Sequence, residues 1–342
     1  MVQSLWFVGP GEVQLKDAPL LEPGADEVRV RGLFSAVSHG TEALLVSGDA
    51  PDHFDPSLDS ERTSTYPRRY GYAWVGEVLA GGLPLGTRVF SLATHAEAHV
   101  LKLNRVRVLP EELPAARATL AASMETALTA VWDAQLCLGA NVLVLGAGTI
   151  GVLVAHLAVQ AGARVVLVDS SLARRQRATA LGISDVRALA EGAPEFDVVF
   201  EVTGNPNVLN YAVALCRTEG RIVVVSFYGK KSANVSLGER FHRQRLKLVS
   251  SQVSAIPPAL GGRFDHDRRF ETVLHLLKDA RLDQLVQART DFRQAPDTYR
   301  RLAQGHVPEQ IVFEYALDSE LDSVLDGERI TSIGPSDENP WS

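Results

Sequence analysis

A glycine-rich turn in the middle of the chain has the spacing that binds phosphate groups. Gly146, Gly148 and Gly151 follow the apolar run VLVL and open the apolar segment GVLVAHLAV, in the order G-x-G-x-x-G. Between a strand and a helix, the first glycine of this pattern makes the tight turn, the second lets the backbone approach a pyrophosphate, and the third packs the helix on the strand. The helix N-terminus adds unpaired N–H groups and a positive dipole end. The turn, with Thr149 and Ile150 before its last glycine, therefore predicts a dinucleotide site.

An acidic residue ends the next apolar run. RVVLVD closes on Asp169, where a carboxylate can accept hydrogen bonds from a ribose 2′-hydroxyl and would repel a 2′-phosphate. Asp169 therefore favours NAD over NADP. Arg174 and Arg175 follow closely, and either could turn toward a 2′-phosphate, so NADP stays open as the alternative. A second alternative gives Asp169 only the structural role of capping the next helix.

These residues lie where predicted strands and helices alternate. From about residue 114, the strand-like runs NVLVLG, RVVLVD, FDVVFEVTG and RIVVVSFYG alternate with helical segments such as SLARRQRATALG. This order predicts a doubly wound parallel sheet with right-handed crossovers. The first 115 or so residues hold short β-type runs punctuated by Gly, Pro and Asp, which predicts a compact, mostly β domain.

Composition argues against several classes of protein. The 342 residues carry a net charge of -7, so no basic excess is available to bind nucleic acid. The most apolar window, residues 142–159, contains three glycines and a histidine, and we interpret it as strand–turn–helix rather than a membrane span. The N-terminus lacks the features of a secretory signal. Two cysteines argue against a disulfide framework and a four-cysteine zinc lobe, and they fit the reducing cytoplasm.

Several motifs together resemble the medium-chain dehydrogenase/reductase superfamily, of the zinc alcohol dehydrogenase type. They are LFSAVSHGTE, YGYAWVGEV, PLGTRVF, AEAHVLK, TALTAVWDA, GANVLVLGAGTIG and EVTGNP. In detail, the pattern S-x-GTE-x-L-x-x-x-G and the run SSQV resemble a zinc-lacking branch close to bacteriochlorophyllide dehydrogenases.

The resemblance implies an α/β fold in which a Rossmann domain is inserted into a GroES-like, mostly β catalytic domain. The expected boundaries are 116–253 for the Rossmann domain, 1–115 plus 254–316 for the catalytic domain, and 317–342 for an acidic C-terminal extension. A small-molecule substrate would lie between the domains. Two copies would form a homodimer in the cytoplasm, without nucleic-acid or membrane partners.

Further cofactor contacts are implied at the ends of the predicted strands. Each candidate follows such a strand directly. The candidates are Thr203 and Gly204 beside the adenosine half, Ser226, Phe227 and Tyr228 beside the nicotinamide, and Ser251 and Gln252 beside its carboxamide.

The zinc-ligand positions of this superfamily carry other residues here. By the resemblance, they fall on Ser38, Tyr72 and Glu125. A serine hydroxyl and a phenol are poor zinc ligands at neutral pH, because a metal requires deprotonated donors. We therefore expect no metal, with a site made by His39, His95 or His99 together with Glu125 as the alternative.

Hydride transfer at a carbinol still needs a group that moves the hydroxyl proton and a group that stabilises the developing alkoxide. The turn VSHGTE offers Ser38, His39 and Thr41, and Tyr72 stands where a zinc ligand would face the cleft. We predict Tyr72 as an acid–base phenol, with Glu125 orienting Tyr72 or His39, or acting as the base in an apolar pocket. Structural roles for these side chains are the alternative.

The sequence thus favours a zinc-independent oxidoreductase that transfers hydride between NAD(H) and a secondary alcohol or ketone. An NADPH-dependent enoyl or quinone reductase is one alternative, and Asp169 speaks against it. A nucleotide-binding protein with little catalysis is another.

Overall fold

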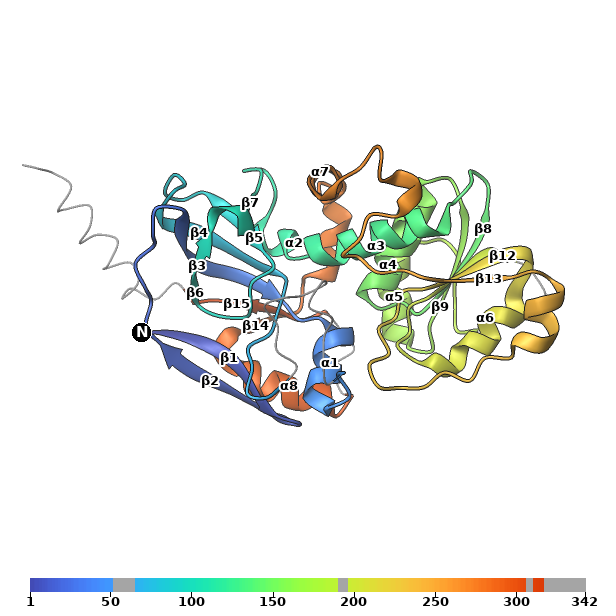
Figure 1. Ribbon diagram of the computed structural model, residues 1–342, viewed down its shortest axis with the longest axis horizontal. Coiled ribbons are helices and arrows are strands. Elements are labelled where there is room, and N and C mark those ends of the chain that lie inside the picture. Colours follow the sequence, from blue (N-terminus) through green and yellow to red (C-terminus); the bar gives the residue numbers. More distant parts are fainter. Residues whose placement is uncertain (52–64, 190–195, 306–309, 317–342) are drawn as a thin grey trace, which may run out of the picture.

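A computed structural model describes residues 1–51, 65–189, 196–305 and 310–316 (Figure 1). Two lobes lie side by side, each built on its own sheet. The sheet of the first lobe has the strand order β14-β15-β3-β4-β5-β7, with β6 also paired to β3. These strands are β3 (Glu27–Ala36), β4 (Trp74–Gly81), β5 (Arg88–Ser91), β6 (Ala98–Lys102), β7 (Arg107–Val108), β14 (Arg289–Asp291) and β15 (Val312–Glu314). The hairpin of β1 (Val2–Gly9) and β2 (Glu12–Ala18) lies beside it.

The second lobe is built on a parallel sheet. Its strand order is β10-β9-β8-β11-β12-β13, and each neighbouring pair is parallel. The strands are β8 (Asn141–Leu145), β9 (Arg164–Val168), β10 (Val186–Arg187), β11 (Phe196–Glu201), β12 (Cys216–Val224) and β13 (Lys247–Ser250). The order reverses between β8 and β11, and ligands of such sheets bind at this crevice, beyond the carboxyl ends of the strands.

Helices join and cover the sheets. The α-helices are α1 (His39–Ser47), α2 (Ala115–Ala118), α3 (Ala121–Ala134), α4 (Thr149–Gln160), α5 (Leu172–Ala180), α6 (Leu209–Leu215), α7 (His266–Leu276) and α8 (Ala295–Ala303). Short 3₁₀ helices are η1 (Leu103–Arg105), η2 (Pro206–Val208), η4 (Pro258–Leu260), η5 (Ala280–Leu285) and η6 (Phe292–Gln294), and η3 (Leu237–Phe241) is a short π-helix. The apolar spacing of α4 makes it almost wholly buried, as a helix packed on a parallel sheet requires.

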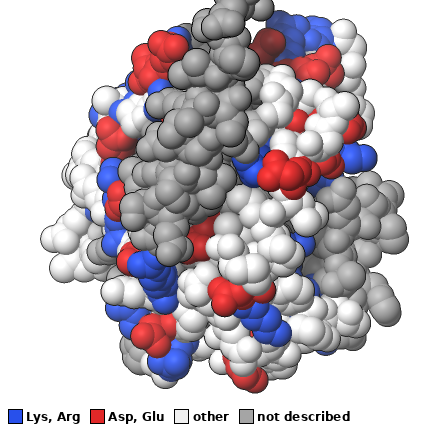
Figure 2. Space-filling view, turned by 90° about the vertical axis from the view of Figure 1, so that its left-hand side faces the viewer, with Lys and Arg blue, Asp and Glu red and all other residues white. Residues whose placement is uncertain are grey.

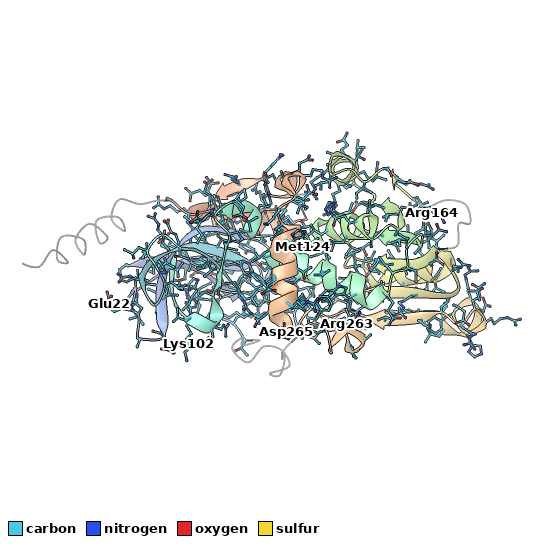
Figure 3. The ribbon with its side chains drawn as sticks, turned by 90° about the horizontal axis from the view of Figure 1, so that it is seen from above. Glu22, Lys102, Met124, Arg164, Arg263 and Asp265 are labelled. Carbon is cyan, nitrogen blue, oxygen red and sulfur yellow. The ribbon has the colours of Figure 1, made fainter. Side chains whose placement is uncertain are left out.

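One apolar core runs through both lobes. It includes Val75 and Phe90 of the first sheet, Met124 of α3, Val144 of β8 and Phe270 of α7. Figure 3 shows α7, which starts after Asp265, standing between the lobes beside the part of α3 that carries Met124. The two lobes therefore meet on a packed interface of helices.

The predicted fold class is confirmed, with a parallel sheet and a largely antiparallel one. The domain boundaries stay a prediction: β14, β15 and α8 lie with the first lobe, whereas α7 packs on α3. The predicted extension 317–342 lies outside the described residues. In the described part of the chain, no helix is long and apolar enough to cross a membrane. On the face shown in Figure 2, the basic and acidic side chains of the described residues are interspersed.

Candidate active site

The glycine turn between β8 and α4 has a different environment at each glycine. Gly146 has φ +108°, and a Cβ there would lie 2.9 Å from the Val202 carbonyl oxygen. At Gly151 a Cβ would lie 1.8 Å from the Gly146 carbonyl oxygen, so the start of α4 packs directly against the backbone of the turn. A Cβ on Gly148 would meet no atom of the described chain within 4 Å. The open space therefore lies at the glycine whose backbone would approach a pyrophosphate, beside the N-terminus of α4.

Asp169, after β9, folds back onto this turn. The residue is 8% exposed, and its Oδ2 accepts a hydrogen bond of 2.8 Å from the Ala147 amide. The cap of α5 is Ser171 rather than Asp169, so the alternative of a helix cap is wrong. Arg174 Nη1 lies 3.6 Å from Asp169 Oδ2, whereas Arg175 donates to the Asp169 carbonyl at 2.7 Å. Of the two arginines, only Arg174 thus contacts the carboxylate.

Glu201, at the end of β11, was not predicted and organises the neighbouring candidates. The residue is fully buried, and its Oε1 accepts bonds of 2.7 and 2.5 Å from the amide and hydroxyl of Thr203. Its Oε2 accepts a bond of 2.5 Å from Tyr228, while the Gly204 amide donates to Ser226 Oγ at 2.9 Å. Burial, and next the Glu201 carboxylate, raise the pKa of Tyr228. The only feature of the sequence that points to Glu201 is that an acidic residue ends an apolar strand.

Three other cofactor candidates lie at the same ends of the sheet. Phe227 is 46% exposed. The Ser251 amide donates to the Val224 carbonyl at 2.9 Å, which holds the segment after β13 against β12. The amide oxygen of Gln252 accepts a bond of 2.6 Å from the Ser254 amide, so it is turned into its own loop.

A side-chain bridge joins the start of α4 to the first lobe. Thr149 Oγ1 donates to Gln310 Oε1 at 2.7 Å, and Gln310 Nε2 donates to the Val37 carbonyl at 2.6 Å. Gln310 is 6% exposed and was missed by the sequence reasoning, because its partners lie far away in the chain. The bridge sets the turn before α1 against the glycine turn. Ile150, next to Thr149, is half-buried and packs on the core.

The predicted proton-transfer groups separate into two places. Tyr72 and Ser38 are together: the Tyr72 hydroxyl donates to Ser38 Oγ. Thr41 lies half-buried in the first turn of α1. Glu125 instead forms an ion pair with Arg269 of α7, with Oε1 2.9 Å from Nε. The expected apolar pocket around Glu125 is therefore wrong, because the buried guanidinium of Arg269 lies against this carboxylate.

His39, beside Ser38, faces the second lobe. Its Nε2 is buried and has no hydrogen-bond partner in the described part of the chain. Burial lowers the pKa of His39 to about 4, Glu42 opposes this effect, and the positive charges of Arg174 and Arg177 add to it. His39 is thus neutral at pH 7 and lies within reach of the charges on α5.

The side chains at the zinc-ligand positions do not fit a zinc ion. The Ser38 and Tyr72 hydroxyls bond each other, and Glu125 is paired with Arg269. Among the described residues, no group of three or more His, Cys, Asp or Glu side chains could hold a metal. A catalytic zinc needs three deprotonated protein donors beside its open position, and of these three positions only Glu125 carries a carboxylate.

A two-lobed chain with a glycine turn at the switch point of a parallel sheet defines a dinucleotide-binding protein. Residues 149–278 match the sequence model of the family described as zinc-binding dehydrogenase. D-guloside 3-dehydrogenase of Escherichia coli is 26% identical over 88% of this chain and 94% of its own length. The 2-desacetyl-2-hydroxyethyl bacteriochlorophyllide A dehydrogenase of Cereibacter sphaeroides is 25% identical over 71% of this chain and 79% of its own.

A solved structure shows the same fold. Galactitol-1-phosphate dehydrogenase from Escherichia coli superposes with a TM-score of 0.75 at 21% identity, covering 91% of this chain and 99% of that one. These matches support the medium-chain dehydrogenase/reductase superfamily. The named dehydrogenase relatives indicate an oxidoreductase of that superfamily.

Proposed function

We propose that the protein transfers hydride between NAD(H) and a secondary alcohol, or the corresponding ketone, without a catalytic zinc. The observation that carries the proposal is the Tyr72–Ser38 hydroxyl pair, which stands where the resemblance places two zinc ligands. The name of one relative, a guloside 3-dehydrogenase, supports a ring or chain hydroxyl of a sugar or polyol as the substrate group.

The residues around the glycine turn fit NAD. The space at Gly148 and the N-terminus of α4 would hold the pyrophosphate, and Asp169 would accept bonds from the ribose hydroxyls. A 2′-phosphate would meet the Asp169 carboxylate with like charge. Arg174, 3.6 Å from that carboxylate, is the feature that keeps NADP as the alternative. When bound, the nicotinamide ring accepts or supplies the hydride.

The hydroxyl pair would move the proton. In the oxidative direction, the carbinol C–H bond breaks and its electron pair leaves as hydride to the nicotinamide, while the substrate O–H proton passes to one oxygen of the Tyr72–Ser38 pair and the pair releases one of its own protons to solvent. In the reductive direction, the Tyr72 phenol turns its O–H from Ser38 to the substrate oxygen and stabilises the developing alkoxide. His39, neutral at pH 7, is the second group that could accept a proton, through Nε2, which has no hydrogen-bond partner among the described residues.

The test uses protein purified without added metal. We expect substoichiometric zinc by mass spectrometry, and NAD-dependent turnover within a panel of alkyl glycosides, alditols and simple secondary alcohols. That turnover should survive 1,10-phenanthroline. Stoichiometric zinc retained after chelation, or activity lost to the chelator and restored by zinc, would contradict zinc independence. Tight NADH binding without turnover on the whole panel would favour a nucleotide-binding protein instead.

We further propose a cytoplasmic homodimer, as the resemblance implies. Size-exclusion chromatography with light scattering measures the mass in solution against the 37.0 kDa of one chain. A single species of one-chain mass over a wide concentration range would contradict the dimer.

A further inference from the structure

A buried polar network lies directly behind the hydroxyl pair. Ser35 of β3, Glu42 of α1, His95 and Tyr299 of α8 are completely buried, and Tyr315 is 4% exposed. They come from segments spread over most of the chain, since Tyr299 and Glu42 are 257 residues apart. Buried polar groups are costly unless each is hydrogen-bonded, so a network at this depth indicates a specific role for the geometry it fixes.

The hydrogen bonds of the network lead to Glu42. The Ser35 hydroxyl is 2.7 Å from both the Tyr315 hydroxyl and His95 Nδ1. His95 Nε2 lies 3.2 Å from Glu42 Oε2. Tyr299 also donates to Glu42 Oε2. Burial, and next the Glu42 carboxylate, raise the pKa of Tyr299, which keeps this phenol a donor.

The second carboxylate oxygen of Glu42, Oε1, reaches the turn that carries Ser38. Ser38 is the N-cap of α1, a position where a serine hydroxyl ordinarily accepts a bond from the first turn of its helix. The Ser38 side chain makes no such bond and receives the Tyr72 hydroxyl instead. Glu42 Oε1 accepts a bond of 2.9 Å from the Ser38 amide, like the carboxylate arm of a capping box. Glu42 thus holds the helix start and leaves the Ser38 hydroxyl for Tyr72.

The same network supports the Tyr72 side of the pair. The His95 amide donates to the Tyr70 carbonyl at 3.1 Å. A Cβ on Gly71, whose φ is +130°, would lie 2.9 Å from the His95 imidazole carbon Cδ2. His95 therefore packs against the backbone that precedes Tyr72, while its ring binds the carboxylate that holds Ser38.

We propose that Glu42 is a positioning residue of the active site, which acts through the Ser38 amide and through His95 to fix the Tyr72–Ser38 hydroxyl pair. The proposal rests on the proposed function, because it concerns the pair to which proton transfer is assigned. Glu42 does not touch the substrate. It holds the backbone that carries the Ser38 hydroxyl, and a misplacement of about 1 Å costs an enzyme on the order of 10²-fold in rate.

The test compares Glu42→Gln with a matched control, Glu27→Gln. Glu27 also uses its carboxylate to accept a backbone amide bond, from Gly24 at 3.0 Å, at the start of β3 and away from the network. Fluorine NMR of protein labelled with 3-fluorotyrosine follows the seven tyrosines, and Tyr72→Phe assigns the resonance of Tyr72. Glu42→Gln should shift that resonance in the same sense as Ser38→Ala, whereas Glu27→Gln should leave it in place.

Kinetics give the second readout. Glu42→Gln should lower kcat by about 10²-fold and leave KM and NADH affinity little changed. The reason is that the positions of the Tyr72 and Ser38 hydroxyls matter for the transition state and not for ground-state binding. A variant with a lowered melting temperature but an unshifted Tyr72 resonance and parental kcat would overturn the proposal. If Glu42→Gln does not fold, Tyr299→Phe removes one donor to the carboxylate, and an unshifted Tyr72 resonance there would overturn it equally.

The two proposals fail in different ways. If Glu42→Gln shifts the Tyr72 resonance and Tyr72→Phe turns over at the parental rate, the positioning is supported and the assignment of the proton donor is wrong. If Tyr72→Phe is inactive and Glu42→Gln leaves the Tyr72 resonance unshifted, the donor is supported and Glu42 has only a structural role.

Discussion

Two glycines of one turn should respond to alanine in opposite ways. At Gly148 the backbone has φ -67° and ψ 179°, which alanine adopts freely, and no atom of the described residues lies within 4 Å of the added methyl group. At Gly151 the methyl carbon would lie 1.8 Å from the Gly146 carbonyl oxygen. Gly148→Ala should therefore spare the fold and obstruct the cofactor, whereas Gly151→Ala should damage the fold itself.

The magnitudes follow from these contacts. Gly148 is the N-cap of α4, where alanine is somewhat worse than glycine, so the loss of stability should stay below about 1 kcal/mol. Overpacking at Gly151 costs roughly 1–3 kcal/mol, which is about 2–12 °C in melting temperature for a domain of this size class. A methyl group that displaces the pyrophosphate removes at least one charge-assisted hydrogen bond, worth roughly 1.5–3 kcal/mol, so the Kd for NADH should rise about 10- to 160-fold.

Calorimetric titration with NADH and with ADP-ribose, beside thermal unfolding, separates the two effects. ADP-ribose contains the pyrophosphate without the nicotinamide, so Gly148→Ala should weaken both ligands alike. Gly262→Ala is the control, because its added methyl group also meets no atom within 4 Å of the described chain and it lies outside the glycine turn. Parental NADH affinity in Gly148→Ala would show that the open space at this glycine is not the pyrophosphate site.

Three further predictions concern the carboxylate, the phenol and the buried histidines. Asp169→Asn should lower the ratio of the Kd for NADPH to the Kd for NADH by roughly 5- to 150-fold, since the charge that repels a 2′-phosphate is removed. The same ratio as in the parent protein, measured by titration with both cofactors, would contradict this. Tyr72→Phe should lower kcat by about 10²–10⁴-fold without changing NADH affinity, which stopped-flow kinetics and titration can measure. Burial lowers the pKa of His39 and His99 from 6.5 to about 4, so the unfolded chain binds more protons than the native one between these values. The free energy of unfolding should therefore fall as the pH drops from about 6.5 to about 4, and urea unfolding of His39→Gln should show a shallower fall than the parent.

The cofactor half of the site could be predicted because it is encoded locally. The first and last glycines of the turn are only five positions apart, and each is required by contacts made within the turn and its neighbouring strand. Asp169 is likewise placed by the strand that it ends. Local spacing cannot reveal Glu125 beside Arg269, 144 positions away, or Glu201 beside Tyr228. Each of these pairs joins segments that are distant in the sequence, so it forms only when the tertiary structure brings those segments together.

The other half of the site requires this long-range assembly. A zinc ion draws its ligands into one geometry by its own bonds, so the chain need only bring the donors near. Two hydroxyl groups exert no such pull, and each can rotate toward water or backbone instead. On the proposed mechanism, the chain itself must then hold Ser38 and Tyr72 in register. A fully buried carboxylate, tied by Tyr299 to α8 and through His95 and Ser35 to Tyr315 after β15, is a rigid means of doing so. On this proposal, the hydroxyl groups at the expected zinc-ligand positions and the buried network behind them belong to one catalytic arrangement, because the network supplies the geometry that a metal would otherwise impose.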